Sequence, residues 1–168
     1  MNPRGISWVV AAALLGSGPL VSSSAPRPPA VIVGLAGLWH FDMYDAGNAS
    51  PAATGQRQMR LLADSTKLLW TEIFDTRSDT GTGILGYDSA KDVYYVLGAY
   101  THEPHPMVQI GRADGSGRTI LFDAASGNLE TPGVFIASEL RLVDSDHFEW
   151  VAADGRWRVR FTRIGAIR

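Results

Sequence analysis

The sequence predicts an all-β fold, an antiparallel up-and-down meander that closes into a β-barrel of about ten strands. Two observations lead to this fold class. Short segments rich in β-branched and aromatic residues follow one another from residue 34 onward, separated by tight polar turns. No helical pattern longer than one or two turns interrupts them. A long meander covers its edges best by closing, and roughly eight to ten strands leave room for one small ligand. A two-sheet sandwich is the alternative.

The N-terminus has the layout of a secretory signal peptide. Arg4 supplies a positive charge, Trp8–Leu15 a short apolar run, and Ser23–Ala25 a small-residue exit. The apolar run is shorter than the roughly 20 residues that span a bilayer, which disfavours the alternative of a retained membrane anchor. We therefore expect an extracytoplasmic protein, periplasmic or secreted, without stable membrane insertion after cleavage. The expected organisation is a signal peptide over residues 1–25, an extended leader over 26–33 and a single β-barrel domain over 34–168.

Composition and charge exclude several classes of function. The 168 residues carry a formal net charge of −2, and removal of Arg4 with the signal peptide leaves 14 Lys and Arg against 17 Asp and Glu, a net charge of −3. This small negative charge, without basic runs, argues against nucleic acid and anionic membrane surfaces as partners. Because the sequence contains no cysteine, disulfides, a thiolate nucleophile and Cys-ligated metals are excluded.

The first predicted elements lead into a strand and a hairpin. Val31–Leu38 fits either a short helix or the approach to a strand, because its glycines weaken a helix. Trp39–Tyr44 alternates apolar and polar residues and is the first predicted strand. Ala46–Gly55 is a loop of small residues. Gln56–Ala63 and Lys67–Asp75 then form the next predicted hairpin.

A central hairpin joins Gly81–Tyr87 to Val93–Thr101 through the polar turn Asp88–Asp92. Its second strand is apolar on both faces. We therefore expect protein, or a filled cavity, on each side of that strand. Beyond it, Met107–Arg112 is predicted to pair with Arg118–Phe122.

The last third of the chain contains one more strand, Val134–Val143, and a final hairpin. The final hairpin turns at Asp154-Gly155, a dipeptide typical of a two-residue type I′ turn, which fixes the register of the two strands. The resulting cross-strand pairs are apolar with apolar on one face and acid with base on the other, as expected of a stable hairpin. The predicted pairs include Trp150 with Val159, Phe148 with Phe161 and Glu149 with Arg160.

Three motifs, taken in order, carry a resemblance to a known family. They are Gly37-Leu38-Trp39 at the first strand, Gly-Ile-Leu-Gly-Tyr-Asp at Gly83–Asp88 followed by the aromatic strand at Tyr94-Tyr95, and a closing strand that ends in Phe161–Ile164. This order resembles the bacterial family catalogued as domain of unknown function 1579, over roughly residues 34–165. The family is similar to lipocalin-like barrels, so the resemblance implies that fold. It implies no activity, because none is established for the family as a whole.

The Gly-x-Trp motif also resembles the first-strand motif of lipocalins, in which an arginine of the last strand lies across the tryptophan. The alternation of the last strand agrees, because Trp157, Val159 and Phe161 put Arg163 on their own face. We therefore expect the guanidinium of Arg163 over the ring of Trp39, a structural contact worth about 0.5–2 kcal/mol.

The candidate ligand-binding residues are large apolar side chains of the predicted strands, which would line a cavity for a small apolar molecule. They are Trp70, Phe74, Tyr95, Leu97, Trp150 and Trp157.

Few polar residues suggest chemistry. His102, Glu103 and His105 are weak candidates for metal ligands, because they offer at most three groups without the helical H-E-x-x-H spacing, and a solvated rim loop is the favoured interpretation. Glu72 shares a face with apolar neighbours and is either a site residue or, as the pattern favours, on the wet side of a half-buried strand. A role for the histidines as acid or base would need a partner such as Glu72 or Tyr100. We expect no cofactor and no catalytic residue.

Two classes of function follow from the sequence. The favoured class is a secreted barrel that binds a small apolar ligand without catalysis. The alternative is a barrel with a polar site, acting as a haem or metal binder or as a small-molecule enzyme. A third possibility is an interior filled by aromatic residues, with a function on the outer surface.

Overall fold

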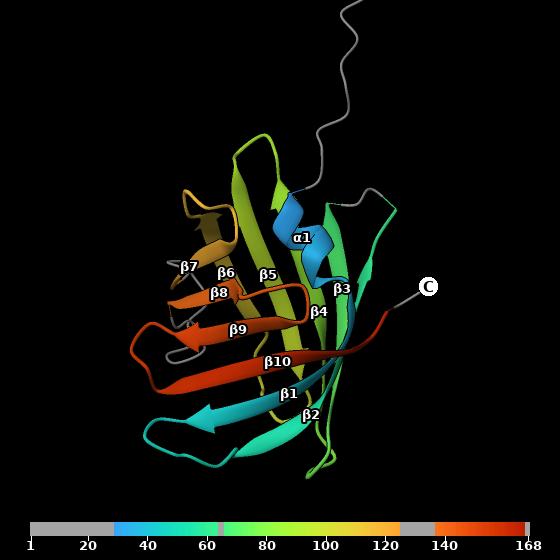
Figure 1. Cartoon of the computed structure of the whole chain (residues 1–168), viewed down its shortest axis with the longest axis vertical. Coiled ribbons are helices and arrows are strands. Elements are labelled where there is room, and N and C mark those ends of the chain that lie inside the picture. Colours follow the sequence, from blue (N-terminus) through green and yellow to red (C-terminus); the bar gives the residue numbers. More distant parts are fainter. Residues whose placement is uncertain (1–28, 64–65, 125–136, 167–168) are drawn as a thin grey trace, which may run out of the picture.

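The computed structural model describes residues 29–63, 66–124 and 137–166. Within these residues, ten strands form one closed antiparallel barrel, in which β10 pairs with β1 to close the ring (Figure 1). The predicted all-β meander and its closure are confirmed, and the up-and-down order of the strands fits a lipocalin-like barrel. The elements are α1 (Ala30–Leu35), β1 (Gly37–Asp45), β2 (Ala53–Leu61), β3 (Lys67–Phe74), β4 (Thr80–Asp88), β5 (Val93–Tyr100), β6 (Met107–Ala113), β7 (Thr119–Ala124), β8 (Ser138–Leu142), β9 (His147–Ala152) and β10 (Trp157–Gly165).

Several sequence predictions lie outside the described residues. These are the signal peptide over residues 1–25, the first three residues of the leader over 26–33, and the beginning of the strand expected at Val134–Val143, whose described part is β8. The extended form predicted for the leader is wrong for residues 30–33, which belong to α1 and bury Val31 and Ile32. The alternatives for Val31–Leu38 are resolved, since α1 runs to Leu35 and β1 begins two residues later.

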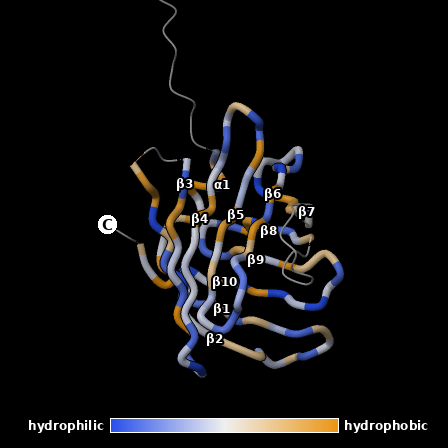
Figure 2. Tube along the Cα trace, turned by 180° about the vertical axis from the view of Figure 1, so that it is seen from behind, coloured by the Kyte–Doolittle hydropathy of each residue, from blue (hydrophilic) through white to orange (hydrophobic). Residues whose placement is uncertain are grey.

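Side chains alternate between the barrel interior and its outer surface along each strand, because successive Cβ atoms of a strand point to opposite faces. In β2, Arg57 and Met59 are buried, whereas Gln56 and Gln58 are exposed. Figure 2 shows this alternation as hydrophobic and hydrophilic residues that follow one another along the strands. The largest fully buried side chains are Trp39, Trp70, Phe41, Phe122, Phe148 and Phe161.

Glycines make room for the largest of these rings. Gly83 of β4 and Gly98 of β5 lie opposite each other and face the interior, and the indole of Trp70 covers both. A Cβ atom placed on Gly83 would lie 2.4 Å from Cζ2 of Trp70. Because neither glycine has a Cβ atom, the ring of Trp70 can pack directly against the backbone of β4 and β5.

One end of the barrel is closed by α1, which lies across the strand ends (Figure 1). Val31, Ile32 and Leu35 of this helix are fully buried. The indole Nε1 of Trp39 donates a hydrogen bond of 2.9 Å to the carbonyl of Leu35, which fixes the helix to β1. We call this end, formed by α1, the start of β1 and the end of β10, the closed end. Among the described residues, no helix has the length and apolar character needed to cross a membrane.

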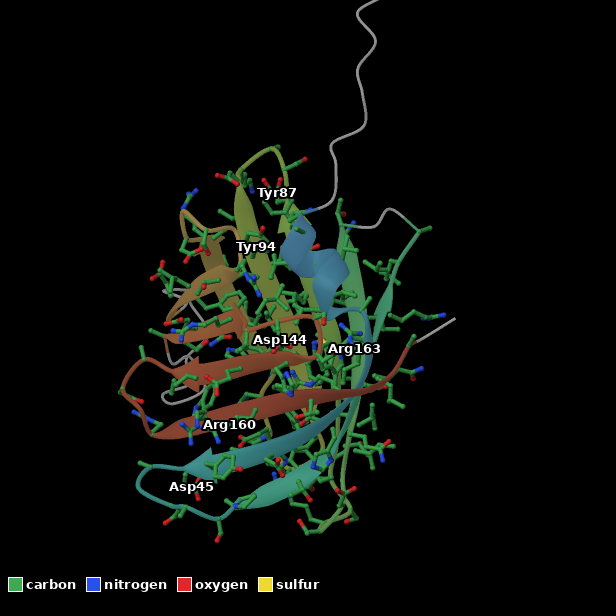
Figure 3. The ribbon with its side chains drawn as sticks, viewed as in Figure 1. Asp45, Tyr87, Tyr94, Asp144, Arg160 and Arg163 are labelled. Atoms are coloured by element: carbon green, nitrogen blue, oxygen red, sulfur yellow. The ribbon has the colours of Figure 1, made fainter. Side chains whose placement is uncertain are left out.

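Arg163 joins the closed end together, and Figure 3 shows it beside α1. Its guanidinium carbon lies 4.1 Å from the ring centre of Trp39, so the predicted contact is confirmed. The same guanidinium donates hydrogen bonds to three backbone carbonyls, those of Ala36 at 2.7 Å, Gly34 at 2.8 Å and Ser145 at 2.8 Å. Each of its three nitrogens therefore has an acceptor within the protein itself.

The final hairpin has the predicted register, with Trp150 opposite Val159, Phe148 opposite Phe161 and Glu149 opposite Arg160. Its turn differs from the prediction. A type I′ turn needs a positive φ at both central residues, but of Asp154 and Gly155 only the glycine has one, at 73°. The backbone N–H of Gly155 donates to the carbonyl of Ala152 at 2.9 Å, so the turn is centred on Ala153 and Asp154, and Gly155 follows it with its positive φ.

Candidate ligand cavity

A cavity of about 300 Å³ occupies the barrel end opposite α1, which we call the cavity end. Its volume is at the lower limit of small-molecule pockets. Figure 3 shows how far apart the two ends lie, since Asp45 ends β1 near the cavity end while Tyr87 and Tyr94 lie near the closed end. The cavity is lined by Phe41, Met43, Arg57, Glu72, Phe74, Arg77, Tyr100, His102, Glu103, His105, Met107, Gln109, Trp150, Trp157 and Val159.

The wall of the cavity is mostly apolar. Met43 of β1 and Val159 of β10 lie opposite each other in neighbouring strands, and Trp157 is two residues before Val159 on the same face. Phe41 and Phe74 meet edge to face with ring centres 5.2 Å apart. An apolar molecule that enters would exchange water for contact with these side chains, which is favourable.

The cavity floor is polar and centres on one buried ion pair. Arg57 of β2 and Glu72 of β3 lie directly opposite in the strand register and are 3% and 4% exposed. Both Nε and Nη2 of Arg57 donate to the Oε2 of Glu72. The guanidinium carbon also lies 4.9 Å from the ring centre of Trp70 and 4.8 Å from that of Phe161. Charge pairing and ring contacts thus offset part of the cost of removing both charges from water.

Tyr100 completes the floor beside this pair. Nη2 of Arg57 donates a hydrogen bond of 3.3 Å to the Tyr100 hydroxyl. Burial raises the pKa of Tyr100 to about 12, and the nearby cation of Arg57 opposes this only in part. The phenol therefore keeps its proton at neutral pH and can donate it to a neighbouring oxygen.

A second polar cluster fixes the orientation of a wall residue. The Ser138 hydroxyl accepts hydrogen bonds from the Gln109 side-chain amide at 3.0 Å and from the indole Nε1 of Trp150 at 2.9 Å. Because the indole N–H points to Ser138, the apolar body of Trp150 is left to face the cavity.

The rim of the cavity carries paired charges. Arg77 lies over the ring of Phe74 at 4.2 Å and forms an ion pair of 2.9 Å with Asp79. The ring of His102 is 3.4 Å from Asp79 and 3.7 Å from Glu103. Among the residues that the structure describes, no group of three or more His, Asp or Glu is arranged to hold a metal ion.

The structure brings only some of the sequence-predicted residues to the cavity. Phe74, Trp150 and Trp157 line it, and Trp70 lies beneath the floor against Arg57. The three weak metal candidates, His102, Glu103 and His105, lie at the rim, as a rim loop requires.

Two predicted residues do not reach the cavity, and the expectation for the second central strand is corrected with them. Tyr95 and Leu97 point to the outer surface, where Leu97 is 46% exposed, because the inward face of β5 carries Tyr94, Val96, Gly98 and Tyr100. The outer face of this strand is thus partly open to solvent instead of being covered by protein.

The interpretation of Glu72 as a wet-side residue is also wrong, since its carboxylate faces inward and is paired. Arg57 and Gln109 were not recognised as site residues from the sequence. A signal for Arg57 appears only once the register of β2 and β3 is known, because that register sets it opposite Glu72. An arginine and a glutamate opposite each other on the inward face would then have marked the floor.

No family model and no curated protein matches the chain. The resemblance to the domain of unknown function 1579 therefore stays a prediction. Among solved structures, the chain is similar to a redesigned β-barrel with a TM-score of 0.44 and 16% sequence identity, over 79% of this chain and 94% of the other.

Proposed function

We propose that this protein is an extracytoplasmic barrel that binds a small apolar molecule in the cavity and carries out no catalysis on it. The observation that supports the proposal is the cavity of about 300 Å³, whose wall of aromatic and aliphatic side chains offers a ligand apolar contact on several sides. The extracytoplasmic location rests on the signal-like sequence of residues 1–25.

A cavity-filling variant tests the proposal. Val159→Phe places a ring in the space that the ligand would occupy, while Leu97→Phe makes a comparable change on the outer face of β5. We expect the dissociation constant of 2-ethylnaphthalene, measured by equilibrium dialysis, to rise at least about tenfold in Val159→Phe, because the lost apolar contact is worth more than about 1.4 kcal/mol. The matched Leu97→Phe protein should bind like the wild type.

The natural ligand can be sought by native mass spectrometry of the protein purified from its own host. An extra mass of a few hundred daltons that disappears on denaturation would support the proposal and identify the ligand class. If the wild type bound no 2-ethylnaphthalene up to its solubility limit, or if Val159→Phe bound it as well as the wild type, the proposal would be wrong.

A further inference from the structure

The polar floor of the cavity contains hydrogen-bond donors that have no acceptor among the described residues. Arg57 has five N–H donors, of which those on Nε and Nη2 point to Glu72 and Tyr100. Its Nη1 is buried and has no hydrogen-bond partner in the described part of the chain. Aromatic rings cover the guanidinium, but a ring face is a weak acceptor compared with an oxygen.

The hydroxyl of Tyr100 is a second donor without an acceptor. Its one hydrogen-bond partner among the described residues is Nη2 of Arg57, and in that bond the Tyr100 oxygen is the acceptor. The hydroxyl proton is therefore directed elsewhere, and Tyr100 belongs to the cavity lining. Since the raised pKa keeps this group protonated, the floor presents a donor for an oxygen atom of a ligand.

Neither arginine of the cavity lining is free to pair with a ligand. The lining contains two arginines, Arg57 and Arg77, and two glutamates, Glu72 and Glu103. Arg57 is paired with Glu72 inside the cavity, and Arg77 is paired with Asp79 at the rim. A ligand carboxylate would therefore be added beside an arginine that already has a carboxylate partner, and its charge would lose hydration without a free cation in return.

From the free donor of Tyr100 and the paired arginines, we infer that the ligand is uncharged and carries an oxygen that accepts a hydrogen bond from Tyr100, as a ketone, aldehyde, ester or alcohol would. The inference rests on the proposed function, and it adds the chemical class of the ligand. The apolar body of such a molecule would lie between Met43, Val159 and Trp157, with its oxygen turned toward the floor.

Three naphthalenes with a substituent of similar size at position 2 test the inference by equilibrium dialysis. They are 2-ethylnaphthalene without an acceptor, 2-acetylnaphthalene with a neutral carbonyl, and 2-naphthoate with a carboxylate. The two neutral probes differ in hydration, but this difference is the same for every protein variant. The change in their affinity ratio between variants therefore isolates the hydrogen bond to the protein.

In Tyr100→Phe, we expect the preference for the ketone over the hydrocarbon to fall about fivefold relative to the wild type, the effect of one neutral hydrogen bond. Tyr94→Phe is the matched control. It removes a hydroxyl from the same inward face of the same strand, near the closed end and outside the cavity lining, so the ratio should stay as in the wild type. The melting temperature of each variant checks that both proteins are folded.

The charge arm compares the ketone with the carboxylate. In the wild type we expect 2-naphthoate to bind at least about tenfold more weakly than 2-acetylnaphthalene, because its charge lacks a free partner. Glu72→Gln removes the competing carboxylate and should narrow or reverse this difference. If Glu72→Gln does not fold, the wild-type comparison and Tyr100→Phe still decide the question.

The possible failures can be told apart. If the wild type binds none of the three probes, the proposed function fails and the inference with it. If 2-ethylnaphthalene binds but Tyr100→Phe leaves the affinity ratio unchanged, the function stands and the role of Tyr100 is overturned. If 2-naphthoate binds the wild type more tightly than the ketone, the inference of an uncharged ligand is overturned.

Discussion

Two arginines of the barrel interior, one at each end, have the same kind of neighbours but differ in their hydrogen bonds. Arg163 lies over Trp39 at the closed end, and all three of its nitrogens donate to backbone carbonyls. Arg57 lies over Trp70 and Phe161 at the cavity end, and its Nη1 has no partner among the described residues.

This difference separates a structural arginine from one that suits binding. The acceptors of Arg163 belong to α1, to Ala36 directly after it and to the loop before β9, so the closed end is complete without any ligand. At the cavity end, Nη1 of Arg57 and the hydroxyl proton of Tyr100 have no acceptor among the described residues. A ligand oxygen would accept from the Tyr100 hydroxyl, which lines the cavity, whereas Nη1 is buried behind it.

The largest loss of stability is expected from a substitution at the cavity end. Glu72→Ala leaves the guanidinium of Arg57 buried without its counter-charge, and we expect the free energy of unfolding to fall by about 3–5 kcal/mol. Urea denaturation measures it. The double variant Arg57→Met, Glu72→Leu should lose less than Glu72→Ala, because no charge is left buried. A loss below about 1 kcal/mol in Glu72→Ala would show that Arg57 does not depend on this pairing.

A somewhat smaller loss of stability is expected from a substitution at the closed end. Arg163→Ala removes three charge-assisted hydrogen bonds and the contact with Trp39, but the side chain is 23% exposed and water replaces part of the loss. We expect the free energy of unfolding to fall by about 2–3 kcal/mol, again by urea denaturation. Arg163→Lys should recover less than half of it, because an ammonium cannot reach three acceptors in a fork.

Arg163→Ala also tests whether the closed end contributes to ligand binding. Arg163→Ala should leave the affinity for 2-acetylnaphthalene unchanged at a temperature where the protein is fully folded. A loss of affinity comparable to that of Tyr100→Phe would contradict the separation of a structural end from a binding end.

A smaller effect is expected where Trp70 supports Arg57. Gly83→Ala puts a Cβ atom 2.4 Å from Trp70 and 2.1 Å from the Leu97 carbonyl oxygen, so the ring and the strand must shift. We expect a loss of about 1–3 kcal/mol in the free energy of unfolding. Gly115→Ala is the matched control, since no atom lies within 4 Å of its added Cβ. Equal stability of the two variants would show that the wall yields easily at Gly83.

The contact between Arg163 and Trp39 at the closed end could be predicted, because Gly37-Leu38-Trp39 resembles the lipocalin motif and the alternation of the last strand puts Arg163 on the inward face. The register of the final hairpin could be predicted because the pattern of cross-strand pairs and the position of the turn indicate the same register. This holds even though the turn itself is not type I′.

The cavity floor was not predictable, because it depends on contacts between strands. Arg57 looks like any polar strand residue until the register of β2 and β3 sets it against Glu72. The inward face of β5 was misassigned for a related reason. The inward face contains Gly98, so it looks less hydrophobic than the outward face, which contains Leu97. A glycine occupies the inward position because Trp70 fills the space where a side chain would lie.

The smallest expected effect compares two buried tyrosines of β5 at high pH. Burial raises the pKa of Tyr100 at the cavity end and of Tyr94 toward the closed end, each from 10.0 to about 12. Because the folded state holds these protons more tightly than the unfolded state, their contribution to stability is fully present below pH 10. It is lost as the pH rises through about 12.

Urea denaturation between pH 8 and pH 11.5 should show this decline in the free energy of unfolding. The decline should be less steep in Tyr100→Phe and in Tyr94→Phe, and least steep in the double variant. Equal slopes in the wild type and in the double variant would show that these two tyrosines do not cause the decline.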